Sequence, residues 1–324
     1  MNEQKKLRFF GIGKILPFLR PFRKSLLVMV IFGLISSGTD ILLPLFQRYA
    51  LDHFVVQKTL DTIWVFTAAY FLTYCLAAVV NYISCTLATV IEVQVSRDMR
   101  HAAFSHLQKL SCSYFNQNSV GYIHARLMSD TSRIGTLVSW TLIDSIWRIS
   151  YLVGSVAVML YMNTRLALMV LTIVPLLVVL FAIFQKKLIK VNREIREVNS
   201  QITANFNEGI TGAKTTKTLV LEDQSSDSFN KLTGEMKEAG IRAARLNAVY
   251  IPLVLFFSTM AVAIVLLRGG HLVLSQVLEL ATLSAFTSYA VGIFEPIQMT
   301  AANIAEFISL QASIERVTDL LDKE

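Results

Sequence analysis

Apolar residues in this chain gather in long runs that contain few charged residues or none. Residues 62–91, 166–185 and 246–267 carry no charged side chain at all. Each of these runs reaches the roughly 20 residues that an α-helix needs to cross a bilayer. Three further runs are apolar but interrupted by one or two charges: 25–47, 134–164 and 280–305. The pattern therefore predicts six membrane-spanning helices.

Two longer and more polar segments, residues 92–133 and 186–245, separate some of these runs. They lack Gly, Pro and Ser clusters, and their apolar residues recur with the period of about 3.6 that is typical of a helix. We therefore expect the membrane helices to extend into the cytoplasm and return as two helical hairpins. The first hairpin should reverse at residues 116–121 and the second around Gly212.

The N-terminal segment, residues 1–24, mixes basic residues with apolar ones and contains Pro17 and Pro21. The apolar run that follows is too long for a signal peptide, and no cleavage site of small residues follows it. Such a mixture is typical of a short amphipathic segment that lies in the membrane interface. We predict this location for residues 1–24, ahead of the six-helix domain at 25–310.

Basic residues indicate the orientation of the chain. Of the 30 Lys and Arg residues, 23 lie in the N-terminal segment and the two hairpin segments, whereas the other connections are short and poorly charged. Lys and Arg favour the cytoplasmic side. We therefore expect both termini and both hairpins in the cytoplasm, most simply at a bacterial plasma membrane.

Composition supports a membrane protein and gives no sign of a metal site. Hydrophobic residues make up 54% of the chain and charged residues only 16%, against about 25% charged in soluble domains. The three cysteines and five histidines lack the spacing of zinc ligands, so we expect neither a metal nor a disulfide framework.

The stretch GITGAKTTKTLVLEDQ, residues 209–224, contains the residue types of a phosphate-binding loop but not their spacing. A P-loop requires Lys directly after its second Gly. Here Ala213 separates Gly212 from Lys214, and Gly209 is two positions too close. No buried strand precedes the stretch. We therefore expect no nucleotide site and no catalytic residue in this chain.

Several ionisable residues lie at membrane depth, where they usually face a cavity or a partner. Asp40 either lines a translocation cavity and favours cationic cargo or bonds a neighbouring helix. Asp144 and Arg148 are four positions apart, and a structural ion pair is the favoured interpretation.

The sixth run contains further candidates for the cavity. Glu295 either faces the cavity or bonds another helix, and Pro296 beside it can kink the helix. Gln298 and Met299, further along the same helix, are candidates for cargo contact.

Four segments in order, 95–110, 113–130, 207–223 and 293–322, resemble the transmembrane domain of an ATP-binding-cassette (ABC) exporter of the type IV fold. The second segment, SYFNQNSVGYIHARLMSD, and the third, NEGITGAKTTKTLVLED, are similar to the two cytoplasmic tips of that family. The resemblance covers almost the entire chain. It implies an all-α membrane protein with six helices and long cytoplasmic extensions.

The resemblance also implies partners. The two tips would dock on an ATPase domain that binds ATP and Mg²⁺, and the fourth and fifth helices would cross to a second transmembrane subunit in a domain-swapped homo- or heterodimer. Residues 311–324 would begin a linker to the ATPase domain, which we expect either beyond residue 324 of a longer protein or in a separate chain. The residues assigned to coupling are Tyr114, Phe115, Asn116, Gly121, Arg126, Asp130, Gly212, Lys217, Leu219 and Glu222.

The expected function is the ATP-driven export of a hydrophobic or amphipathic drug, lipid or peptide by alternating access. Two alternatives remain, a six-span secondary carrier and a regulatory membrane subunit that transports nothing. A secondary carrier would show paired halves with broken helices, and the sequence has no internal repeat of that kind.

Overall fold

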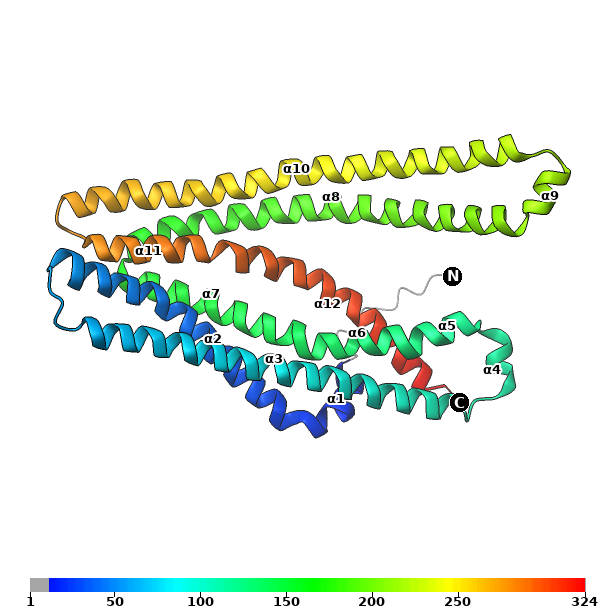
Figure 1. Ribbon diagram of the computed structural model, residues 1–324, viewed down its shortest axis with the longest axis horizontal. Coiled ribbons are helices and arrows are strands. Elements are labelled where there is room, and N and C mark those ends of the chain that lie inside the picture. Colours follow the sequence, from blue (N-terminus) through cyan, green and yellow to red (C-terminus); the bar gives the residue numbers. More distant parts are fainter. Residues whose placement is uncertain (1–11, 324) are drawn as a thin grey trace. The chain divides into compact units, whose positions relative to one another are not determined.

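The computed structural model describes residues 12–323, with the side chains of Ile12, Lys14 and residues 301–309 left out. Every regular element in this range is helical (Figure 1). The prediction of an all-α protein with six spans is confirmed. A helix satisfies its backbone hydrogen bonds within the segment, which is necessary because lipid offers no hydrogen-bond partner. Within residues 12–323, six helices are long and apolar enough to cross a membrane: Ile15–Val56, Ile63–Leu107, Val120–Met162, Thr164–Thr211, Glu222–Leu274 and Leu280–Thr300.

The chain divides into two compact units, and each is described by itself. The first unit comprises Met1–Leu168 together with Val265–Glu324, and the second comprises Met169–Ile264.

The first unit begins with α1 (Ile12–Leu19) and a 3-10 turn, η1 (Arg20–Phe22). These elements form the described part of the N-terminal segment, and residues 1–11 lie outside the described range. The first long helix, α2 (Arg23–Ala50), continues into a π-helical turn, η2 (Leu51–Val56). The second, α3, runs from Ile63 to Leu107.

The first hairpin turns through a short helix of its own. This helix, α4 (Cys112–Gln117), follows α3, and the chain is extended at Asn118 and Ser119 before the return helix begins. The reversal thus starts earlier than residues 116–121, where the sequence placed it. The return helix is a continuous rod with two π-helical turns: α5 (Val120–His124), η3 (Ala125–Asp130), α6 (Thr131–Thr136), η4 (Leu137–Thr141) and α7 (Leu142–Met162).

The sixth span is broken. Helix α11 (Leu280–Gly292) ends and α12 (Phe294–Leu321) begins on either side of Ile293. Pro296 lies at the third position of α12 and has no N–H to donate to the carbonyl of Gly292. The division between α11 and α12 lies three residues before this proline, and a kink at Pro296 itself stays a prediction.

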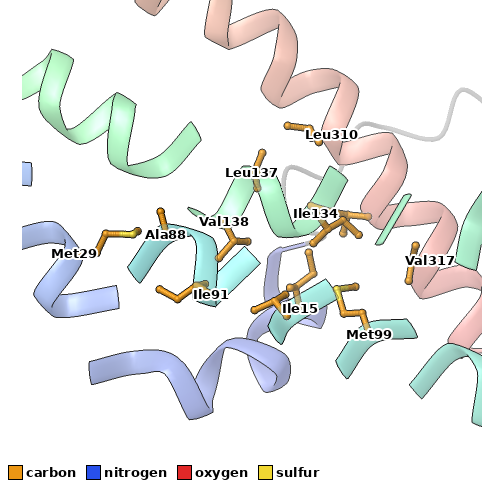
Figure 2. Packing of buried hydrophobic residues seen from close by; sticks show 12 residues of the cluster. Ile15, Met29, Ala88, Ile91, Met99, Ile134, Leu137, Val138, Leu310 and Val317 are labelled. Carbon is orange, nitrogen blue, oxygen red and sulfur yellow. The ribbon is translucent and has the colours of Figure 1, made fainter. Parts of the chain in front are cut away.

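A core of buried apolar side chains joins six elements of the first unit, α1, α2, α3, α6, η4 and α12 (Figure 2). The cluster includes Ile15 of α1, Met29 of α2, Ile91 of α3, Ile134 of α6 and Val317 of α12, and each of these is at most 1% exposed. Residues 311–321, which the sequence assigns to a linker, are thus helical and partly packed in this core.

The second unit is a helical hairpin. Most of α8 (Thr164–Thr211) and of α10 (Glu222–Leu274) lie in it side by side, joined by the short helix α9 (Ala213–Thr218) (Figure 1). Arg242 of α10 donates to Glu194 of α8 at 2.5 Å. The rings of Phe184 and Tyr250 lie 5.4 Å apart. These contacts hold the two long helices together along their length.

Candidate functional site

The first tip, residues 111–124, combines an inward-facing and an outward-facing aromatic residue. Tyr114 of α4 packs against a small buried cluster formed by Ala103, Leu107, Leu110 and Leu320. Phe115 beside it is 46% exposed. The Tyr114 ring anchors α4 to the hairpin, and Phe115 remains free to contact another protein. Asn116 is also exposed.

Gly121, at the return of the first tip, is exposed in open space. No atom lies within 4 Å of the position that a Cβ would occupy there. Its φ angle is not positive, and neither is that of Gly212. Neither glycine therefore adopts the left-handed backbone conformation, in which glycine is favoured because it has no Cβ.

Arg126 and Asp130 lie behind the first tip and are buried. The Arg126 guanidinium stacks over the Tyr122 ring, 4.2 Å from its centroid. Asp130 accepts two hydrogen bonds from Arg316 of α12, at 2.8 Å from Nε and 2.7 Å from Nη2. This bond to Asp130 raises the pKa of Arg316 above its ordinary value. These two residues of the predicted coupling set thus brace the hairpin instead of forming its outer surface.

Arg316 was missed by sequence reasoning because it lies in the segment assigned to a linker. Its Nη2 also donates to Ser313 at 2.9 Å. Nearby, His106 of α3 is hydrogen-bonded to the carbonyl of Lys323 at 2.7 Å. The end of the chain is thereby fastened to the first hairpin. No signal in the sequence alone joins residues 130 and 316, since they are 186 positions apart.

The second tip, residues 209–224, presents apolar side chains around α9. Leu219 is 60% exposed and Val220 81% exposed. Lys217 and Glu222 are also exposed. Gly212 separates α8 from α9, and a Cβ there would lie 2.9 Å from the Glu208 carbonyl oxygen. A close backbone approach is therefore the physical reason for glycine at this position.

Val220 has a φ of 54°, in the left-handed region that β-branched residues rarely adopt. It follows α9 at the position where helices usually end with glycine. The Leu221 N–H donates to the Thr216 carbonyl at 2.9 Å, which is the bond expected of a Schellman motif. The second tip thus holds an exposed valine in a strained conformation.

A groove of about 440 Å³ runs along the second tip between the ends of α8 and α10. Its apolar lining includes Phe206, Ile210 and Phe229, and the first two are more than half exposed. Lys217 and Glu222 lie at the same groove. An apolar floor with charges of both signs suits contact with another protein surface.

The polar residues predicted at membrane depth are partly brought together. Asp40 of α2 accepts a hydrogen bond from Trp147 Nε1 of α7 at 2.8 Å. Asp144 and Arg148 form the predicted ion pair at 3.1 Å. Asp40 and Asp144 both line a pocket of about 290 Å³ between α2, α3 and α7. The interhelical bond of Asp40 is therefore present, and its role in a translocation cavity stays a prediction.

The candidates on α12 lie apart from this pocket. Glu295 and Met299 are exposed and Gln298 is half-buried. None of the three lines the pocket that contains Asp40. Instead, α3 supplies a polar group, Glu92, that was not among the predicted site residues. Glu92 accepts hydrogen bonds from Trp140 Nε1 at 2.8 Å and from Thr136 at 2.7 Å.

Among the residues that the structure describes, no group of three or more His, Cys, Asp or Glu side chains could hold a metal ion.

Comparison with known proteins adds the family context. The profile of the family described as "ABC transporter transmembrane region" matches residues 26–297. An uncharacterized ABC transporter ATP-binding protein of Bacillus subtilis, YknV, is 23% identical over 99% of this chain and 54% of its own length. YgaD of the same organism, provisionally named a multidrug export ATP-binding/permease protein, is 23% identical over 95% of this chain and 54% of its own length. The chain spans about half the length of the curated relatives it matches.

Proposed function

Because the chain belongs to the family of ABC transporter transmembrane regions, we propose that it is the translocation unit of an ATP-driven exporter. It would move a hydrophobic or amphipathic compound out of the cytoplasm or the inner leaflet by alternating access. The observation that carries the proposal is the pair of hairpin tips, each built on a short helix with exposed apolar side chains. Relatives named as ATP-binding proteins, about twice as long as this chain, support an ATPase partner.

The two tips would receive the ATPase domain. In the first tip, Phe115 and Gly121 are exposed. Tyr114 fixes their position, because its ring packs against the buried cluster of the first hairpin. In the second, Leu219 and Val220 project beside the groove. Exposed apolar groups of this size are costly in water and are typical of an interface core. ATP and Mg²⁺ would bind on the ATPase domain, and this chain would supply only the docking surface.

Movement of a docked domain would reach the membrane by two routes. The first hairpin connects to α12 through Asp130 and Arg316, and the second continues without interruption into the spans of α8 and α10. Helices are stiff enough to carry such a displacement over many turns. The break at Ile293 between α11 and α12 gives the sixth span a place to bend.

A second transmembrane subunit would complete the pathway. The spans of α8 and α10 expose many large apolar side chains, including Val179, Ile183, Leu255 and Phe256. In a membrane these side chains face lipid or another subunit. We propose a domain-swapped dimer, a homodimer or a heterodimer, in which the hairpin of α8 and α10 packs against the partner. Asp40, Glu295, Gln298 and Met299 are the proposed cavity residues.

The test is ATP-dependent transport by the chain together with its ATPase domain. Inside-out vesicles that contain both should take up a fluorescent amphipathic dye when ATP and Mg²⁺ are added, and a non-hydrolysable ATP analogue should not support uptake. The ATPase domain should also co-purify with the chain. Absence of both uptake and co-purification would overturn the proposal.

A further inference from the structure

The pocket between α2, α3 and α7 has the chemistry of a cation site. It is lined by two carboxylates, two indole rings and small polar side chains: Gly33, Ser36, Asp40, Ala77, Asn81, Ser84, Cys85, Trp140, Ile143, Asp144 and Trp147. Its volume of about 290 Å³ is far larger than a bare metal ion requires. All its lining residues belong to the first unit, so the pocket is complete within one chain.

Charge in this pocket is not balanced. Arg148 pairs with Asp144 at 3.1 Å and neutralises it. Asp40 accepts its hydrogen bond from Trp147, a neutral donor, and no Lys or Arg among the described residues forms an ion pair with it. A carboxylate at membrane depth without a cation is costly. A positively charged ligand would remove that cost.

Ser84 provides an independent sign of a ligand. Its side chain is only 5% exposed, it lines the pocket, and its hydroxyl has no hydrogen-bond partner. Other hydroxyls on the same helix, such as those of Thr86 and Thr89, donate to the carbonyl four residues earlier. The Ser84 hydroxyl is therefore left available for a group inside the pocket.

Two indole rings complete the recognition chemistry. Trp147 is held by its bond to Asp40, and Trp140 is held by its bond to Glu92 at 2.8 Å. Both indoles are thus held in place by hydrogen bonds, and both line the pocket together with Asp40. Organic ammonium groups bind where aromatic faces and a carboxylate converge, since cation–π attraction and charge pairing act together. A hydrated inorganic cation gains little from indole.

We propose that this pocket binds the ammonium group of an organic cation, with Asp40 as its counter-ion, Trp140 and Trp147 as its aromatic walls and Ser84 as a hydrogen-bond partner. The proposal deepens the proposed export function and rests on it, because it names the head group of the cargo. Asp144 contributes to the lining but remains paired with Arg148.

Binding can be measured without an ATPase domain, so its outcome is separable from that of the transport test. The chain would be placed in lipid nanodiscs in a Trp64→Phe background, since Trp64 is 83% exposed and lies outside the pocket. The chain has three tryptophans, so the tryptophan fluorescence of this variant comes from Trp140 and Trp147, which both line the pocket. The probe is benzyltrimethylammonium, and the neutral control is its carbon analogue neopentylbenzene.

Benzyltrimethylammonium should produce a saturable change in tryptophan fluorescence, and neopentylbenzene should not. Asp40→Asn keeps an oxygen acceptor for Trp147 but removes the charge, and should weaken binding by about tenfold or more, a loss of ~1.4 kcal/mol or more. The role of Ser84 is tested with benzylammonium, whose N–H groups can donate to the hydroxyl oxygen: Ser84→Ala should weaken its binding roughly two- to fivefold and leave that of benzyltrimethylammonium, which has no N–H, unchanged. The control is Asp61→Asn, which also removes one negative charge but lies outside the pocket. It should leave the affinity for benzyltrimethylammonium unchanged.

Two results would overturn the assignment. One is equal binding of the charged probe and its neutral analogue, which would show an unspecific apolar pocket. The other is an Asp40→Asn protein that binds the ammonium probe as tightly as the parent.

Discussion

The ion pair between Asp130 and Arg316 is the strongest polar connection between the first hairpin and the end of the chain. The Asp130 side chain is only 7% exposed, whereas that of Arg316 is 40% exposed. Two parallel N–H···O bonds fix the geometry of such a pair as well as its energy. Removal of the arginine would leave a buried carboxylate without its hydrogen-bonded cation.

Arg316→Gln should therefore destabilise the protein by roughly 1–3 kcal/mol, the cost of leaving a buried acceptor without its partner. Thermal unfolding in detergent would measure the loss. The control is Arg97→Gln, because Arg97 is 73% exposed and pairs only with its neighbour Asp98. Adding Asp130→Asn to Arg316→Gln should restore part of the stability. An Arg316→Gln protein as stable as the Arg97→Gln protein would contradict this assignment.

Val220 is a second position where one residue decides local stability. Because a β-branched residue is strained at a φ of 54°, Val220→Gly should relieve strain on the order of 1 kcal/mol and retain the bond from Leu221 to Thr216. Amide exchange in residues 216–221 should slow, as followed by mass spectrometry. Val249→Gly, an exposed valine inside α10, serves as the control and should speed exchange locally. Faster exchange at the tip of the Val220→Gly protein would refute the strain.

At the scale of elements, the short helices α4 and α9 distinguish the two hairpins from plain turns. Each is six residues long and lies between much longer helices. The two glycines beside them differ in their surroundings. Gly121 faces open space, whereas a side chain at Gly212 would meet the Glu208 carbonyl.

Gly121→Val should thus leave the isolated chain unchanged and act only on a docked ATPase domain. Gly212→Val should also shift the backbone at the start of α9. With the ATPase domain present, both variants should lose the stimulation of ATP hydrolysis by cargo, while assembly in the membrane stays normal. Gly234→Val, in open space within α10, should keep full stimulation. Transport by the Gly212→Val protein at the parent rate would remove the coupling role of the second tip.

At the scale of the whole molecule, the proposed orientation puts both tips on the cytoplasmic side. Single cysteines at Lys58, Asn163 and His271 should react with a membrane-impermeant maleimide added to intact cells, and those at Asn118 and Thr215 only after permeabilisation. The native Cys75, Cys85 and Cys112 are free and would first be replaced by serine. Labelling at Thr215 in intact cells would reverse the orientation.

The sequence alone determined the six spans, the helical character of the hairpins and the missing backbone donor at Pro296. These features depend on local physics: a run without charge must satisfy its backbone within lipid, and proline removes a donor wherever it occurs. The pair of Asp144 and Arg148 was also predictable, because four positions on one helix fix their distance. Recognition of the tips as docking elements came from four segments in family order and remains a prediction at the level of single residues.

Tertiary structure decided what packs against what. Asp130 and Arg316 are 186 positions apart, and Trp147 is 107 from Asp40, so only the packing of α2, α7, η3 and α12 brings them into contact. The unpaired hydroxyl of Ser84 and the clash that a side chain at Gly212 would cause likewise depend on neighbouring atoms that no sequence period specifies. Local sequence sets which segments are helices, and the contacts between distant helices set which polar groups are compensated and which remain available to a ligand.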